Sequence, residues 1–372
     1  MSYNPFLMRV VILSKACIVG QYQTKLTALA AKPDIELTVI VPPEWRDERG
    51  TLRLERRHTD GYNLIVAPMR WNGHFHLHYY PTLPEILTQA APDIFHIDEE
   101  PYNLATYRAM RTIQVAPRAH TLFFSWQNIL KKYPPPFSWM EQYVYHNAAA
   151  AIAGNAEAET ILRRKGFQKT ICIIPQFGVP PSFFPDPQPR APSPIVIGYA
   201  GRLVHEKGIT LLMNALSQVQ GDWQLQILGS GPLHDSFKSL AQQLHIDQRV
   251  QFAPWVSSDA MPRFYNSLDL LVVPSLTQPN WKEQFGRVIM EAMACGIPVI
   301  GSSSGEIPNV IGDAGIIFPE GNITALVNAL NTLIQDPMRR QQLGAAGRAR
   351  ALTMFSQQRV VDDTFALYQR LL

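Results

Sequence analysis

One stretch in the last third of the chain constrains the fold more than any other. The largely apolar run 268–274 precedes a loop, and a second apolar run, 298–301, follows a helical segment, so the pattern predicts two buried strands with a helix between them. Gly286 lies where this helix should begin, and Gly296 followed by Pro298 lies where it should end. The stretch therefore predicts a strand, loop, helix, strand unit of an α/β protein.

The start of this helix is suited to a phosphate group. Free N–H groups of the first turn and the positive end of the helix dipole attract an anion, and Gly286 has no Cβ to hinder its approach. Glu283 lies in the loop ahead of the helix and Glu291 lies two turns into it. One of these glutamates can then reach the hydroxyls of a sugar beyond the phosphates, and the other those of a ribose behind them. The alternative is an ordinary buried helix with solvated glutamates.

The same residues resemble the donor-site signature of a known family, the retaining family 4 glycosyltransferases. The resemblance extends in register through Glu283, Phe285-Gly286, Glu291, Ala292-Met-Ala-Cys-Gly-Ile-Pro-Val299, Gly305–Pro308 and Gly312–Gly315. It implies the GT-B fold, an α/β architecture of two Rossmann-like domains that face each other across a cleft. It also implies that the second domain binds most of the donor.

Chain length and a proline-rich segment favour two domains. A chain of 372 residues exceeds what one core usually holds, and the prolines of residues 180–194 break both helical and strand periodicity. We therefore predict an N-terminal acceptor-binding domain at 1–185 and a C-terminal nucleotide-sugar-binding domain at 186–354. The resemblance further implies that the last helix, within 355–372, crosses back to the first domain.

A basic motif follows the first predicted strand of the second domain. Residues 201–208, Gly-Arg-Leu-Val-His-Glu-Lys-Gly, resemble the phosphate motif of the family. The Arg202 guanidinium can donate hydrogen bonds to two phosphate oxygens at once, and Lys207 can add a mobile positive charge. Together they would neutralise a departing diphosphate. The alternative is a pair of surface cations flanking a turn. The residues expected to carry catalysis are Arg202, Lys207 and Glu283, and those expected to bind the donor are Gly201, Gly229, Gly231, Trp255, Val256, Phe285, Gly286, Arg287 and Glu291.

The first domain departs from the family pattern at two places on its acceptor side. The loop after the first strand carries a single glycine, Gly20, where the family usually has two, and the tip of strand 118–125 lacks the usual histidine. The resemblance then implies that the leaving phosphate takes the acceptor proton, although a role for His120 stays open. The residues expected near the acceptor are Gly20, Glu99, His120, Trp126, Gln127 and Asn128, with Trp126 as a platform on which a ring can stack.

Two further segments of the first domain each allow two interpretations. Residues 45–57 are rich in arginine and are either a solvated loop or a site for an anionic or sugar acceptor. Residues 131–139 combine two lysines, three prolines and Trp139, and are either a stiff connector or a loop that rests on a membrane surface.

Composition limits the compartment and the partners. The formal net charge of +3 is slight and forms no basic stripe, which excludes a typical nucleic-acid-binding protein. Cys17, Cys172 and Cys295 each lie in an apolar setting and are expected to be buried thiols in a reducing compartment. We find no signal peptide and no apolar segment of the ~18 residues that a membrane span needs. We therefore expect a cytoplasmic protein, with peripheral contact at the inner membrane face as an extension of that expectation.

Together with the resemblance to the retaining family 4 glycosyltransferases, these observations predict a metal-independent retaining hexosyltransferase. It would use a nucleotide diphosphate sugar, with UDP favoured by its frequency in the family, and a glycan or lipid-linked acceptor in surface polysaccharide or glycoconjugate synthesis. We expect no cofactor, and the chain has no Asp-x-Asp pair to argue for a metal. The alternatives are a nucleotide-sugar epimerase or hydrolase on the same fold, and an inactive sugar-binding protein.

Overall fold

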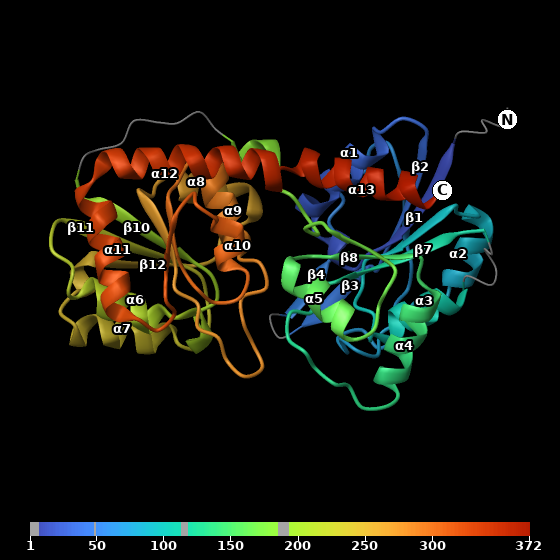
Figure 1. Cartoon of the computed structure of the whole chain (residues 1–372), viewed down its shortest axis with the longest axis horizontal. Helices are drawn as coiled ribbons and strands as arrows, with labels where there is room; N and C mark the ends of the chain where they lie inside the picture. The colour runs from blue at the N-terminus through green and yellow to red at the C-terminus, as the bar shows by residue number, and fades with distance from the viewer. Residues whose placement is uncertain (1–6, 48–49, 113–117, 185–192) are drawn as a thin grey trace. The chain divides into compact units, whose positions relative to one another are not determined.

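The chain folds into two compact units. The computed structural model describes residues 7–47, 50–112, 118–184 and 193–372. Unit 1 comprises Met1–Gly178 with Gln357–Leu372, and unit 2 comprises Val179–Ser356 (Figure 1). The boundary predicted between residues 185 and 186 lies outside the described residues. The last helix, α13 (Gln357–Leu371), is part of unit 1.

Unit 1 is built on a parallel sheet of seven strands. Their spatial order is β5 (Asn63–Val66), β2 (Ile35–Val41), β1 (Met8–Leu13), β6 (Ile94–Ile97), β7 (His120–Ser125), β8 (Ala150–Ala153) and β9 (Thr170–Ile173). The central strands are buried on both faces, which explains their continuous apolar runs.

Helices cover both faces of this sheet. One face packs on α2 (Leu83–Ala90), α3 (Leu104–Arg111), α4 (Phe137–Asn147) and α5 (Ala156–Arg164), and the other on α1 (Gln23–Ala30) and α13 (Figure 1). Asn155 caps α5, because its side chain accepts a hydrogen bond from the Ala158 amide at 2.7 Å. On the other face, His96 and Tyr368 are 2.7 Å apart and join α13 to β6.

Unit 2 is built on a second parallel sheet, of six strands. Their order is β12 (Val250–Ala253), β11 (Trp223–Leu228), β10 (Ile195–Ala200), β13 (Leu270–Val273), β14 (Val299–Ser302) and β15 (Ile316–Phe318). One face packs on α6 (Ile209–Leu216), α7 (His234–Gln243) and α11 (Ile323–Gln335), and the other on α8 (Met261–Asn266), α9 (Arg287–Ala294) and α10 (Ile307–Ile311). Helix α12 (Pro337–Arg350) packs on α9. The predicted α/β class with two Rossmann-like units is confirmed.

Several local predictions were wrong or incomplete. The arginine-rich segment, interpreted as either a solvated loop or an acceptor site, contains an antiparallel pair, β3 (Glu44–Asp47) and β4 (Gly50–Arg53). Helices α3 and α7 were not predicted, because their buried stripes are short and made mostly of small residues. Helix α4 begins at Phe137, so Trp139 lies in its first turn and not in the preceding loop.

Candidate active site

The strand order of unit 2 reverses between β10 and β13. From β10 the chain proceeds outward through β11 and β12, and from β13 it proceeds the other way through β14 and β15. In open α/β sheets, ligands bind beyond the carboxyl ends of the strands at such a switch point. The loops that leave β10 and β13 therefore lie where a ligand is expected to bind.

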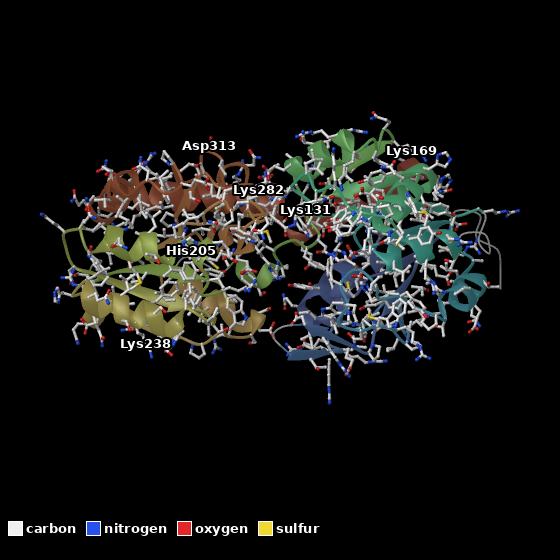
Figure 2. All side chains as sticks on the ribbon, turned by 90° about the horizontal axis from the view of Figure 1, so that it is seen from below. Lys131, Lys169, His205, Lys238, Lys282 and Asp313 are labelled. Carbon is white, nitrogen blue, oxygen red and sulfur yellow. The ribbon has the colours of Figure 1, made fainter. Side chains whose placement is uncertain are left out.

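These two loops bring Lys207 and Glu283 together. The Lys207 ammonium lies 2.6 Å from Glu283 Oε2, although 76 residues separate the two in sequence. The same carboxylate oxygen accepts a hydrogen bond from the Ser275 hydroxyl at 2.8 Å, and the Trp281 ring lies 4.8 Å from the ammonium. His205, in the turn that carries Lys207, and Lys282, next to Glu283, are labelled in Figure 2. The side chain of Lys207 is 23% exposed, so an incoming anion can reach it.

Glycines allow the backbones around this pair to approach closely. An added Cβ would lie 1.9 Å from the Pro274 oxygen at Gly208, 1.9 Å from the Gly201 oxygen at Gly229, and 2.1 Å from the Glu283 oxygen at Gly305. Gly231 packs in the same way on the backbone of Leu203. These glycines thus let the loops after β10, β11, β13 and β14 pack against one another.

Gly208 offers a test of this packing. It has a φ of +69° and follows Lys207 directly, so a side chain there meets both backbone strain and a backbone oxygen. We expect Gly208→Ala to destabilise the protein by about 2 kcal/mol or more and to displace Lys207. Urea unfolding of the variant measures this loss. Gly296→Ala is the matched control, because Gly296 has a φ of +74° but open space around its Cβ position. An equal loss in both variants would contradict a role for close packing at Gly208.

Helix α9 begins at the glycine that the sequence indicates. Gly286 is its N-cap residue with a φ of +72°, and the amides of the first turn follow it. The phenyl ring of Phe285, in contrast, packs edge-on against Phe355 with ring centroids 5.7 Å apart. Phe285 therefore contributes packing around the start of α9.

Glu291 is buried within unit 2. Its carboxylate accepts hydrogen bonds from the Tyr265 hydroxyl at 2.8 Å and from Arg287 Nε at 2.6 Å. Tyr265 was missed by the sequence analysis, because its residue type and its place in the apolar helix α8 carry no sign of a polar role. Burial, together with the carboxylate, raises the pKa of Tyr265 well above its usual range, so the hydroxyl stays a donor to Glu291.

The other expected donor residues lie farther from the switch point or on the surface. Arg202 is exposed, and its carbonyl oxygen accepts a hydrogen bond from Tyr199. Trp255 and Val256 follow β12, the outermost strand on that side, and the Trp255 side chain is 52% exposed. They lie at the edge of the sheet.

In unit 1, the residues expected near the acceptor separate into two groups. Glu99 and Trp126-Gln127-Asn128 follow the carboxyl ends of β6 and β7. His120 is the first residue of β7, so it lies at the opposite end of the sheet and is exposed. The hypothesis that His120 shares a site with Glu99 is therefore wrong.

Protein contacts occupy the side chains of Trp126, Gln127 and Asn128 at the tip of β7. The Trp126 ring packs over Gly154, where a Cβ would come within 2.2 Å of it, and its Nε1 donates to Gln176. Gln127 accepts a hydrogen bond from Lys165 at 3.0 Å, and Asn128 donates to Glu157 at 3.2 Å. These contacts hold the tip of β7 in place, and Trp126 is not the open stacking platform that we expected.

The segment that contains Glu55 and Arg57 covers Gly20. The Gly20 amide donates to Glu55 at 2.9 Å, and a Cβ on Gly20 would meet Arg57 at 2.7 Å. This segment therefore occupies the space next to the single glycine.

Sequence reasoning found Glu99 but missed the charged side chains around it. Lys15 pairs with Glu99, and His78 Nε2 lies 3.4 Å from the other carboxylate oxygen. Burial opposes the ionisation of Glu99, yet Lys15 and His78 outweigh it and lower its pKa to about 2. Burial raises the pKa of the neighbouring Glu100 to about 7.

The described residues show neither a metal-binding group nor a membrane-spanning helix. Within the described ranges, no group of His, Cys, Asp and Glu side chains is arranged to hold a metal ion. None of the helices in the described part of the chain has the length and apolar character needed to cross a bilayer.

Comparison with curated proteins places the chain among glycosyltransferases. It is 31% identical over 186 residues to the GDP-mannose-dependent alpha-(1-6)-phosphatidylinositol monomannoside mannosyltransferase of Mycolicibacterium smegmatis, an alignment that covers 46% of this chain and 48% of the relative. The chain therefore aligns with about half the length of this relative.

Comparison with solved structures supports the fold over the whole chain. A glycosyltransferase from Rickettsia africae matches with a TM-score of 0.74 at 17% identity and covers 99% of each chain. Anabaena HepE in complex with UDP matches with a TM-score of 0.72 at 18% identity, covering 98% of this chain and 100% of that one. At this level of identity the likeness shows the fold, and the predicted GT-B fold class is confirmed.

Two family models match the chain, one in each unit. Residues 19–177 match the model described as Glycosyltransferase Family 4, and residues 183–350 match the model described as Glycosyl transferases group 1. Since the two matches together span nearly all of both α/β units, the chain belongs to the group 1 glycosyl transferases of family 4.

Proposed function

We propose that this protein transfers a hexosyl group from a nucleoside diphosphate sugar to a hydroxyl group of a glycan or a lipid-linked acceptor. The observation that carries the proposal is the pairing of Lys207 with Glu283 at the switch point of unit 2. An ammonium that can bind a diphosphate and a carboxylate that can bind sugar hydroxyls are the two groups that such a donor requires. The product would belong to surface polysaccharide or glycoconjugate synthesis.

The proposed chemistry follows from the leaving group. When the bond between the sugar and the diphosphate breaks, negative charge gathers on the phosphate oxygens. Lys207, Arg202 and the first-turn amides of α9 would stabilise this charge more strongly than they stabilise the ground state, which is the origin of rate acceleration. These groups would supply the charge that a metal supplies elsewhere. The leaving phosphate would take the acceptor proton on the same face of the sugar, which retains the anomeric configuration.

Two features would orient the donor beyond its phosphates. Glu283 would bind the sugar hydroxyls, and Glu291, held by Tyr265 and Arg287, would bind the ribose. The choice of base needs a direct test, because the Mycolicibacterium relative is named for GDP-mannose whereas the HepE structure holds UDP. Our sequence-based preference is UDP.

The deciding experiment is incubation of the protein with UDP- and GDP-hexoses, with and without glycan and lipid-linked acceptors. Transfer that requires an acceptor, persists in EDTA and yields a product with the anomeric configuration of the donor supports the full proposal. Release of the diphosphate or epimerisation without an acceptor would favour an epimerase or hydrolase. Nucleotide or sugar binding without turnover would favour an inactive binding protein.

The proposal includes peripheral contact with a cytoplasmic membrane face, through a surface of unit 1. Trp139 is 69% exposed and Leu130 is 40% exposed, and Lys131 and Lys132 are exposed beside them. Apolar and aromatic side chains of this kind enter the interface, while lysines approach anionic headgroups. Figure 2 labels Lys131 on this surface.

We expect the double variant Lys131→Glu and Lys132→Glu to lose binding to vesicles that contain phosphatidylserine. Each lysine near an anionic surface contributes about 1 kcal/mol, so losing two should weaken binding by at least about thirtyfold, and the surface repels the two added carboxylates as well. Vesicle sedimentation measures this, and neutral phosphatidylcholine vesicles provide the reference. Lys238→Glu is the control, since Lys238 is an exposed lysine of unit 2 (Figure 2). Equal losses in both variants would show a non-specific charge effect and contradict this surface.

A further inference from the structure

Unit 1 has a switch point of its own, and it is lined with charged side chains. Its strand order reverses between β1 and β6, from which the chain proceeds in opposite directions. Lys15 follows β1, and Asp98, Glu99 and Glu100 follow β6. The position is equivalent to that of Lys207 and Glu283 in unit 2, where parallel sheets of this type bind ligands.

Folding alone does not account for this cluster. Glu99 and His78 are almost fully buried, and the side chain of Lys15 is 17% exposed. A buried ion pair adds little net stability compared with apolar side chains of the same volume. The pairing does, however, hold the Lys15 ammonium in one place, while part of the Lys15 side chain stays open to solvent.

Aromatic rings flank the exposed part of Lys15. Its ammonium lies 4.8 Å from the centre of the Phe75 ring and 5.5 Å from that of Trp45. Phe75 is 43% exposed, so part of its ring faces solvent beside an ammonium that carries more than one donor proton. A ring beside hydrogen-bond donors suits a ligand that has an apolar face and polar edges.

A further polar group, the Tyr80 hydroxyl, lies near the carboxylates of Glu99 and Asp98. The Tyr80 hydroxyl is buried and has no hydrogen-bond partner among the residues that the structure describes. Burial raises the pKa of Tyr80 well above its usual range, and the nearby carboxylates of Glu99 and Asp98 add to the effect. A hydroxyl in this position retains a hydrogen-bonding capacity that the protein itself does not use.

The charges around Lys15 bear on whether a neutral ligand or a phosphate would bind there. The positive charge of Lys15 is compensated by Glu99 in direct contact, and Asp98 and Glu100 add acidic groups nearby. In the neighbouring segment, Arg46 pairs with Glu44 and Arg57 with Glu55. The Lys15–Glu99 pair with its acidic neighbours therefore favours a neutral ligand over a phosphate, whereas in unit 2 the exposed Arg202 and the N-terminus of α9 add positive charge beside the Lys207–Glu283 pair.

We propose that Lys15, positioned by Glu99 and His78 and flanked by Phe75 and Trp45, forms a binding subsite for a neutral sugar ring. The ammonium donates hydrogen bonds to ring hydroxyls, and Phe75 packs against the apolar face of the ring. This inference rests on the proposed function for its role, which is to hold a carbohydrate acceptor. It specifies that the part of the acceptor bound here is an uncharged sugar. It also assigns the stacking contact to Phe75 in place of Trp126.

Saturation-transfer difference NMR on the whole chain tests the subsite directly. The probes are methyl α-D-mannopyranoside, methyl α-D-glucopyranoside and mannose 6-phosphate, with excess UDP and GDP present to occupy the donor site. We expect a neutral glycoside to bind more tightly than the sugar phosphate. We also expect Phe75→Ala to weaken this binding at least about fivefold, from the loss of ring contact.

Two further variants keep the result interpretable. Leu77→Ala alters the same loop at a residue of similar exposure, 37%, and should bind the glycoside like the wild type. The double variant Lys15→Met and Glu99→Gln removes both charges with little change in volume, and should abolish glycoside binding without loss of folding. Wild-type affinity in Phe75→Ala, tighter binding of mannose 6-phosphate, or no glycoside binding by the wild type would each overturn the subsite.

The same variants separate this inference from the proposed function. Titration with UDP and GDP should give wild-type affinities in all of them, because the donor site lies in unit 2. If the wild type binds glycosides but neither nucleotide, the proposed transfer fails while the sugar subsite stands. If transfer occurs but its KM for acceptor is unchanged in Phe75→Ala, the subsite fails while the proposed function stands.

Discussion

Replacing Lys207 by alanine is expected to lower the rate of sugar transfer by about 10²–10³-fold, the usual effect of removing one group that stabilises developing negative charge. The loss should exceed that of a simple contact, because Lys207 also neutralises Glu283 at 2.6 Å. Without it, a carboxylate would remain beside the departing diphosphate. The measurement is kcat/KM for transfer, together with thermal unfolding to show that the chain still folds.

Two comparisons make the Lys207 result specific. Lys238→Ala removes an exposed lysine of the same unit and should leave transfer unchanged. The double variant Lys207→Ala and Glu283→Gln should be less impaired than the product of the two single effects, since residues in direct contact are not additive. Near-normal transfer by Lys207→Ala would remove this lysine from the mechanism.

Replacing Glu283 by glutamine should separate nucleotide binding from catalysis. The carboxylate competes with a diphosphate for Lys207, so its removal should tighten UDP or GDP binding. Coulomb attraction at this distance is several kcal/mol at an effective dielectric constant of 20, but the partial exposure of Lys207 reduces the net effect. We expect about 1 kcal/mol, or about fivefold in Kd. Transfer should nevertheless fall about 10²-fold, because the sugar hydroxyls lose their acceptor.

Calorimetric titration with the nucleotide, at low and at high salt, measures the binding half of this prediction. Glutamine can keep the hydrogen bond with Ser275, so the loop should stay in place. The gain in affinity should shrink as salt screens the competing charges. Weaker nucleotide binding by Glu283→Gln would contradict competition between the carboxylate and the diphosphate for Lys207. It would indicate that the carboxylate serves to position Lys207.

The donor loops were predictable because their determinants are contiguous in sequence. Gly201 to Gly208 and Glu283 to Glu291 each lie within one strand, loop and helix unit, and local patterning reveals such units. The partners of Glu291 were only partly predictable. Arg287 lies one helical turn before it, whereas Tyr265 comes from a separate helix whose sequence is mainly a packing pattern.

The polar cluster of unit 1 was largely beyond sequence reasoning. Lys15, His78 and Glu99 come from three separate segments, and none of them forms a motif with its own neighbours. A catalytic residue was expected at the carboxyl end of the strand that contains His120. His120 is instead the first residue of that strand, at its opposite end. Contacts of this kind depend on which strands become neighbours.

Taken by itself, the order of residues determined the α/β class, most strands, the glycines at the loop ends and the charged groups of the second unit. Periodicity and turn chemistry act over a few residues, so one chain segment is enough to reveal them. Only the tertiary structure decided that Lys207 meets Glu283, that Glu291 is held by Tyr265, and that unit 1 buries a second charged cluster. The reason is physical: strand order and register set which distant side chains share the edge of a sheet, and that arrangement results from packing of the whole unit.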